Sequence, residues 1–147
     1  MNSANGEKTI RVMNGVVAGT TAQTSSAIDT QGYDGVKIYS LFGAITAGAA
    51  TSVKVQQSGD DGSADAYADL AGTSVTVADD DDNQVVVHDI YRPRERYLKV
   101  VISRATQNAV IDGVVAVLYN AIKKPTTDDS STVVARETHV SPAEGTA

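Results

Sequence analysis

The chain has 147 residues, a formal net charge of −6 and no cysteine. This length suits one domain that buries a core without cross-links, and the lack of cysteine excludes disulfides, a thiol nucleophile, zinc–thiolate sites and iron–sulfur clusters. The negative charge argues against a protein that binds nucleic acid by neutralising phosphates. No apolar run is long enough to span a bilayer, and the first residues lack the order of a secretory signal. We therefore expect a soluble protein, made in a cytoplasm, with neither nucleic acid nor membrane as a partner.

The large apolar residues are mostly β-branched, with 20 Val and 8 Ile against 4 Leu. These residues favour strands, and no segment keeps an apolar period of 3.6 residues for three turns. In chain order, we predict about eight strands, at roughly 9–18, 24–30, 34–42, 51–57, 73–78, 84–91, 96–103 and 109–120. Breaks at such short intervals are typical of a sandwich or barrel and leave no room for parallel βαβ units.

The predicted fold class is all-β: an antiparallel two-sheet sandwich, jelly-roll-like, with about eight strands and extended N- and C-terminal arms. Residues 1–8 and 123–147 are polar and rich in small or turn-forming residues. Such segments bury too little apolar surface to form a core. We therefore predict an N-terminal arm at 1–8, a sandwich domain at 9–122 and a C-terminal arm at 123–147.

Alternation of apolar and polar residues predicts which side chains face the core. The predicted core comprises Val36, Ile38, Val53, Val55, Val85, Val87, Leu98, Val100, Ile102, Val115 and Val117. In segment 109–120, strict alternation places Ile111 with Val115 on one side, and Val114 with Leu118 on the other. The strand is therefore expected to be covered on both faces or to contact a second chain, with a bulge at Gly113.

Charged residues are segregated along the chain. Nine Asp and no Lys or Arg lie between Val55 and Tyr91, whereas 92–104 holds five basic residues and one acid. Opposite potentials steer association and fix orientation. Because the arginine fork matches carboxylates, we predict that Arg92, Arg94 and Arg96 contact an acidic partner surface.

The sequence offers no recognisable catalytic or metal site. The run Asp79–Asp82 supplies oxygen ligands that point in different directions, and 61–69 departs from an EF-hand because Ala66 stands at the sharp-turn glycine position. His88 lies in a predicted strand and is interpreted as a structural or interface residue, while His139 lies in the tail. Nucleophile-elbow, Walker and dinucleotide-binding patterns are absent. We predict no enzyme activity, no catalytic residue, no cofactor and no metal ligand.

Several segments resemble the small jelly-roll cement, or decoration, proteins of tailed bacteriophage capsids. They are the run VKVQQSGDDG at 53–62, YADL at 67–70, DIYR at 89–92 and RYLKVVI at 96–102, and the resemblance extends loosely over 9–120. Other sandwiches, from phage tails and cell-surface lectins, share this pattern, often with Trp where Tyr67 stands. The resemblance implies a virion protein that binds the capsid exterior and stabilises the shell. It implies no active site.

The partners implied are the major capsid protein and further copies of the chain, as a dimer or a trimer. In the C-terminal arm, Val133, Val134 and Val140 are expected to dock on a neighbouring subunit. Two alternatives stay open: a tail, head–tail joining or fibre-associated sandwich, and a carbohydrate- or calcium-binding module. The absence of Trp weighs against stacking of sugars. The occupied capsid axis and the host are left open.

Overall fold

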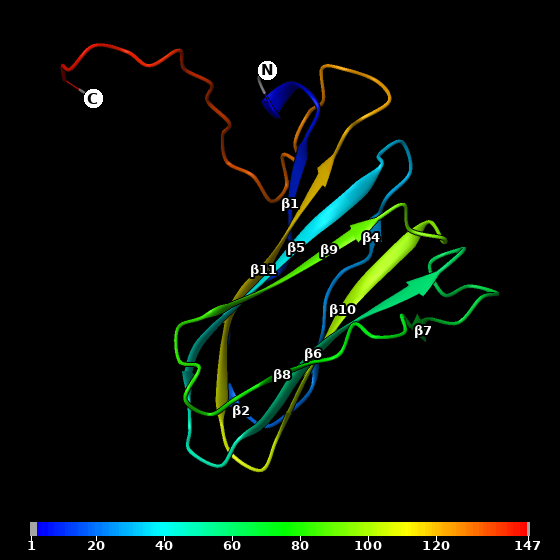
Figure 1. Ribbon diagram of the computed structural model, residues 1–147, viewed down its shortest axis with the longest axis vertical. Helices are drawn as coiled ribbons and strands as arrows, with labels where there is room; N and C mark the ends of the chain where they lie inside the picture. Colours follow the sequence, from blue (N-terminus) through cyan, green and yellow to red (C-terminus); the bar gives the residue numbers. More distant parts are fainter. Residues whose placement is uncertain (1–2, 147) are drawn as a thin grey trace.

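The computed structural model in Figure 1 describes residues 3–146. Residues 1–2 of the predicted N-terminal arm and residue 147 of the C-terminal arm lie outside this range. The elements are a 3-10 helix (Ser3–Asn5) and the strands β1 (Lys8–Met13), β2 (Val16–Gly19), β3 (Gln23–Thr24), β4 (Ile28–Asp29), β5 (Gly35–Ile45), β6 (Ala50–Ser58), β7 (Ala68–Asp69), β8 (Val75–Val77), β9 (Val85–Tyr91), β10 (Tyr97–Ala105) and β11 (Ala109–Tyr119). No helix in the described part of the chain is long and apolar enough to cross a membrane.

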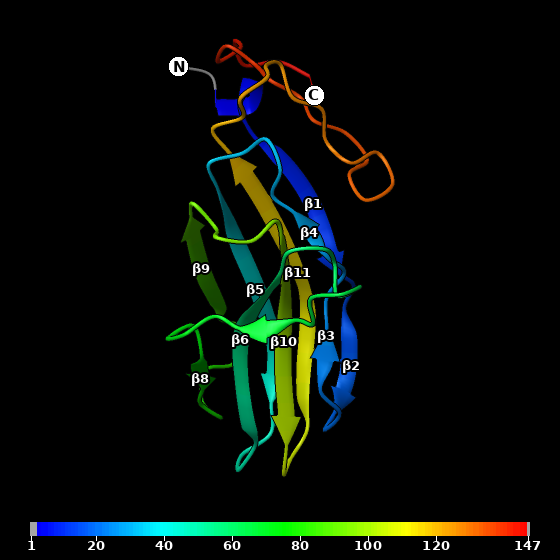
Figure 2. The same cartoon turned by 90° about the vertical axis from the view of Figure 1, so that its right-hand side faces the viewer.

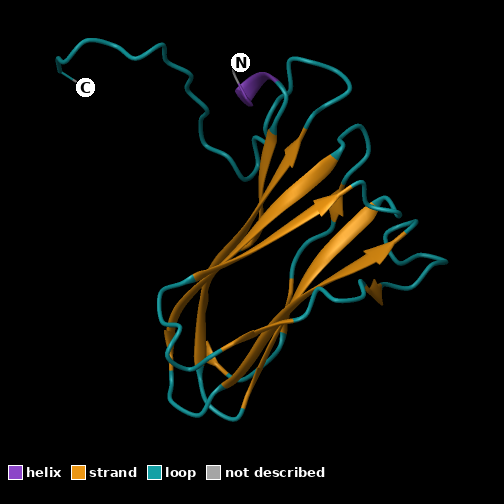
Figure 3. Cartoon of the chain, viewed as in Figure 1, coloured by secondary structure: helices purple, strands orange, loops and turns teal. Residues whose placement is uncertain are grey.

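The strands form two antiparallel sheets that pack face to face (Figure 3). Sheet A has the order β1-β11-β5-β9, with β2 also paired to β11. Sheet B has the order β3-β10-β6-β7, with β4 paired to β10 and β8 to β6. The pairs β1/β2, β3/β4 and β7/β8 are each two halves of one interrupted strand, so the eleven strands occupy eight positions. Numbered along the chain, these positions run 1-8-3-6 in sheet A and 2-7-4-5 in sheet B. This is the jelly-roll arrangement, and the predicted fold class is confirmed.

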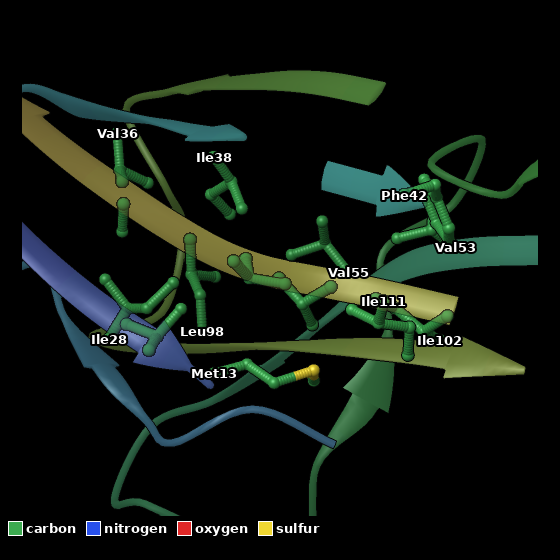
Figure 4. Close-up of a cluster of buried hydrophobic side chains, with 14 of the residues drawn as sticks. Met13, Ile28, Val36, Ile38, Phe42, Val53, Val55, Leu98, Ile102 and Ile111 are labelled. Atoms are coloured by element: carbon green, nitrogen blue, oxygen red, sulfur yellow. The ribbon is translucent and has the colours of Figure 1, made fainter. Parts of the chain in front are cut away.

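The core lies between the sheets. Figure 4 shows Val36 and Ile38 of β5 in the cluster of buried side chains between the sheets, together with Leu98 and Ile102 of β10. Seven of the predicted core residues are completely buried: Val36, Ile38, Val53, Val55, Leu98, Val100 and Ile102. Each contributes about 1.5–3 kcal/mol by leaving water. The antiparallel pairing of β6 with β10 places Val53 opposite Ile102 and Val55 opposite Val100, so that the alternation of both strands stays in phase.

The prediction that Val85 and Val87 lie in the core is wrong. Both side chains are 50% exposed, whereas His88 of the same strand is buried. In the register of β5 and β9, His88 lies opposite the buried Ile38, which fixes the inward face of β9. The His88 Nε2 atom is 2.7 Å from the Thr73 carbonyl oxygen, so the ring has a hydrogen-bond partner inside the sandwich.

The predicted faces of β11 are also wrong beyond Gly113. The pairing of β11 with β5 shifts on both sides of Ile111, and Gly113 has φ +143°, a conformation that side-chain-bearing residues rarely adopt. This bulge, which the glycine predicted, inserts an extra residue and reverses the alternation. Val114 therefore faces the core, as Ile111 does. Val115 and Val117, both predicted to lie in the core, are half-buried on the outer face instead.

Arg104 is a buried cation that holds the β2 side of the sandwich in place. It is only 5% exposed, and its guanidinium donates to the carbonyl oxygens of Thr21 (2.8 Å), Val17 (2.9 Å) and Ala109 (2.7 Å). Hydrogen bonds from charged donors are stronger than neutral ones. The side chain thus ties the turn after β2 to β10 and β11.

Candidate interaction surface

The three predicted arginines lie at one end of the sandwich, in the loop between β9 and β10. Arg96 donates to both carboxylate oxygens of Asp29, at 2.8 and 2.7 Å. This hydrogen bonding lowers the pKa of the Asp29 carboxyl and raises that of the Arg96 guanidinium. The fork of Arg96 is therefore occupied within the chain.

Arg92 and Arg94 remain exposed and flank Pro93. Arg92 has φ 49°, which turns the chain out of β9, and its guanidinium lies 5.2 Å from the centre of the Tyr91 ring. Both arginines line two shallow hollows, one shared with Thr30 and the other with Leu70. Their contact with a partner stays a prediction, and these two residues are better placed for it than Arg96.

The C-terminal arm first folds back along β1 and then leaves the body. The backbone N–H of Thr9 donates to Asp128 Oδ1 at 2.6 Å, and that of Arg11 donates to Thr132 Oγ1 at 3.2 Å. Arg136 completes the attachment: it pairs with Asp128 and donates to the carbonyl oxygens of Ala4 (2.6 Å) and Glu7 (3.1 Å). Residues 123–136 are thus fastened to the sandwich.

The predicted anchors of this arm lie in different environments. Val133 is half-buried, whereas Val134 and Val140 are almost completely exposed, at 104% and 97%. Figure 1 shows the last part of the chain, in red, running away from the sandwich. Two apolar side chains are therefore held in water on the arm, where only a partner could bury them.

The carboxylates of the first acidic loop are used to build the loop. Asp60 accepts hydrogen bonds from the backbone N–H groups of Ser63 (3.0 Å), Ala64 (2.7 Å) and Asp65 (3.1 Å). These bonds, led by the one from Ala64, lower the pKa of Asp60. Asp65 in turn accepts from the N–H of Gly59 at 2.7 Å. The acids stabilise a tight surface loop in the way that Asx turns do.

The second acidic run is built similarly. Asp79 accepts from the N–H of Gly48 at 2.6 Å, Asp81 from that of Ala78 at 2.9 Å and Asp82 from that of Ile45 at 2.5 Å. Asp80 makes no such bond among the described residues and is exposed. Within residues 3–146 no group of three or more His, Asp or Glu side chains is arranged to hold a metal ion.

The outer faces of the two sheets differ in character. The outer face of sheet B is mainly polar and carries Ser52, Lys54, Gln56, Lys99 and Ser103 beside Tyr97 and Val101. On sheet A, cross-strand pairing places Val115, Tyr39 and Val87 in one row, and Leu41 beside Val85 in the next. Leu41 is 38% exposed. We call the set Tyr39, Leu41, Val85, Val87, Val115 and Val117 the apolar face of sheet A. Contiguous exposed apolar groups of this kind mark interaction sites.

A tyrosine bridge bounds this face at one end. The ring of Tyr119 lies across Gly35, where a Cβ atom would come within 2.4 Å of the tyrosine oxygen. The hydroxyl donates to Asp89 Oδ1 at 2.7 Å, and burial, then this hydrogen bond, raises the pKa of Tyr119 to about 12. The bridge fastens the outer sides of β11, β5 and β9 together and fixes the orientation of Asp89.

Sequence reasoning missed the apolar face of sheet A. Its signal was the continuous run Val85-Val86-Val87, which fits a strand with apolar groups on both sides as well as one with a single buried face. The position of His88 inside the sandwich decides between the two.

No protein-family model matches the chain, and no curated protein matches it. A solved structure described as the structure of infectious bursal disease virus Gt strain is similar over 78% of this chain, with 14% sequence identity and a TM-score of 0.42. This chain spans 32% of the length of that one.

Proposed function

We propose that this protein is a non-catalytic structural component of a virion: a cement or decoration protein that binds the exterior of a phage capsid shell. Its partners are the major capsid protein and further copies of itself, and it is made in the host cytoplasm. The observation that carries the proposal is the arm, which is hydrogen-bonded to the body as far as Arg136 and exposes two apolar side chains to solvent, Val134 within the attached part and Val140 beyond it.

The contrast between the packed sandwich and the exposed arm supports the proposal. A jelly roll with a buried core supplies a stiff body, and exposed apolar side chains on the arm gain free energy only when a neighbour covers them. The resemblance of 53–102 to phage cement proteins adds the class of partner, a shell with many equivalent binding positions. The acidic loops favour this reading over a calcium module, because backbone N–H groups already occupy the carboxylates.

Co-sedimentation with capsid shells tests the proposal. Purified protein is mixed with shells that lack it, and the bound fraction is measured after pelleting. We expect binding at many copies per shell, and we expect the double substitution Val134→Asp with Val140→Asp to reduce occupancy at least tenfold. The double substitution Thr138→Asp with Ser141→Asp is a matched control, since it adds the same two charges at exposed polar positions of the arm.

Two outcomes would contradict the proposal. Protein that stays in the supernatant with every shell tested is not a decoration protein. Protein found in virions at about a dozen copies or fewer belongs to the tail or the head–tail junction instead.

A further inference from the structure

β9 is an edge strand with one unused side. The backbone N–H of Phe42 donates to the Gln84 carbonyl oxygen at 3.0 Å, and that of Arg92 to the Asp34 carbonyl oxygen at 2.7 Å. Because backbone groups point to alternate sides of a strand, the even-numbered residues of β9 bond to β5. The N–H and C=O groups of Val85, Val87, Asp89 and Tyr91 therefore point away from the sheet.

Within residues 3–146, β9 pairs with no strand other than β5. Natural sheets protect such edges with lysines, prolines, bulges or a covering segment. Residues 85–91 contain no Lys and no Pro, and their pairing with β5 shows no register shift. Figure 2 shows β9 at one side of the sandwich, with the arm on the far side. The edge has no register shift, it carries Val85 and Val87 beside Asp89 on its outer face, and no other strand of the described residues covers it.

The two ends of β9 are flanked by charges of opposite sign. Asp79–Asp82 precede the strand, and Arg92 and Arg94 follow it. Of these, Asp80 and Arg94 are exposed and take part in no hydrogen bond or ion pair among the described residues. A second β9 running antiparallel would bring the acidic end of each copy to the basic end of the other. A parallel neighbour would bring acid to acid.

The geometry points to a two-fold dimer in which β9 of one copy pairs antiparallel with β9 of a second copy, centred on Val87. In that register Val87 lies opposite Val87, Asp80 lies toward Arg94 of the second copy, and the apolar face of sheet A continues across the junction. Centring the pair on Asp89 would instead oppose two carboxylates, which is unfavourable. The same surface patch serves both copies, as two-fold symmetry requires.

This inference deepens the self-association that forms part of the proposed function. A single strand pair is smaller than a standard protein interface, so we expect a dissociation constant between roughly 10 μM and 1 mM in free solution. On a surface that holds many copies, the local concentration exceeds this range. The dimer itself needs no capsid, so the test below can fail while capsid binding succeeds, and the reverse.

A charge-swap experiment by analytical ultracentrifugation tests the dimer. Sedimentation of the whole chain is measured from about 10 μM to about 1 mM at low salt. Asp80→Arg alone and Arg94→Asp alone should each weaken dimerisation on the order of tenfold, because each places like charges together. The two substitutions combined in one chain should restore it to within about threefold. The matched controls Glu144→Arg and Lys123→Asp make the same charge changes at exposed positions outside β9 and should leave it unchanged.

A second variant tests the backbone pairing. Val87→Pro removes an N–H group that bonds to nothing within the chain, so the fold should persist while the dimer is lost. Circular dichroism checks the fold. If Val87→Pro does not fold, the charge-swap series decides alone. A protein that stays monomeric up to about 1 mM overturns the inference. The inference is also overturned if Asp80→Arg and Arg94→Asp each leave the dimer intact, or if the combination of the two substitutions does not restore it.

Discussion

One edge of sheet A is covered by the chain's own arm, and the other edge is open. At the β1 edge, the outward N–H groups of Thr9 and Arg11 are bonded to Asp128 and Thr132 of the same chain. Pairing of β1 with β11 also shifts register between Arg11 and Met13. At the β9 edge, neither a covering segment nor a register shift is present among the described residues. Figure 2 shows the two edges on opposite sides of the sandwich.

With one edge covered and the other open, the sheet avoids indiscriminate association and still offers a specific contact. An edge strand is a template for any extended chain, and covering it with the chain's own arm removes that template. An open edge with acids at one end and bases at the other selects antiparallel copies of itself, because charge complementarity fixes the orientation.

Removing Arg104, the buried cation that holds β2 and the turn after it, should have the largest effect. Arg104→Met leaves three carbonyl oxygens without their donor and should lower the free energy of unfolding by about 3 kcal/mol. Urea denaturation measures the change. Arg104→Lys keeps the charge but loses the planar guanidinium. Its free energy of unfolding should therefore lie between those of the unsubstituted protein and the methionine variant. A loss below about 1 kcal/mol for the methionine variant would show that water replaces the guanidinium freely.

A matched pair of substitutions tests the open side. Val55→Thr buries a hydroxyl in the core and should destabilise the protein by about 2 kcal/mol. Val87→Thr changes a side chain that is half-exposed, so it should stay within about 0.5 kcal/mol in the monomer. Both are measured by denaturation at low protein concentration. Equal losses at the two positions would mean that Val87 is covered in solution even when the chain is dilute.

Truncation separates the two parts of the arm. Deleting 137–147 should change stability by less than about 0.5 kcal/mol, because this part makes few contacts with the body. Deleting 125–147 removes Asp128, Thr132 and Arg136 and should cost about 1–2 kcal/mol, since the bonds at the β1 edge are lost. The longer deletion should also make the protein associate at concentrations where the shorter one does not. Indistinguishable behaviour of the two truncated proteins would contradict the role of 123–136 as an edge cover.

Acid should weaken the attachment of the C-terminal arm to the β1 edge slightly. Hydrogen bonds from the Ser131 hydroxyl and then its N–H lower the pKa of Asp129 below the ordinary value of 3.8. A depressed folded pKa stabilises the fold above the unfolded value and loses that contribution as pH falls through the folded value. Hydrogen exchange at the Arg11 amide should therefore become faster, relative to the unfolded chain, by a few-fold below about pH 3.8. Asp129→Asn should abolish this pH dependence, and a change that persists in the variant would assign it to another carboxyl.

The sequence allowed most of the fold to be predicted, and the failures have a common cause. Strand positions and the faces of β5, β6 and β10 follow from alternation, since each strand has one clearly apolar side. The faces of β9 and of the second half of β11 could not be predicted, because both sides of these strands carry valine. A single extra residue at Gly113 reverses the faces of β11. In β9, the hydrogen bond between His88 and Thr73 inside the sandwich fixes which side faces the core.

The candidate surface was only partly predictable. The segregation of charge was visible in the sequence, and so were the apolar residues of the arm. That Arg96 pairs with Asp29, while Arg92 and Arg94 stay exposed, depends on residues about 67 positions apart in the chain. The fixing of 123–136 along β1 likewise depends on contacts between the two ends of the chain.

The class of fold, the eight strand positions and the polar character of both ends can be predicted from local features: β-branched content, alternation and turn residues. The exposure of individual valines, the pairing of the arginines and the covering of one edge of sheet A arise only in the folded chain. These properties depend on register and on which distant segment lies beside each strand. One bulge or one long-range hydrogen bond changes them without altering any local pattern.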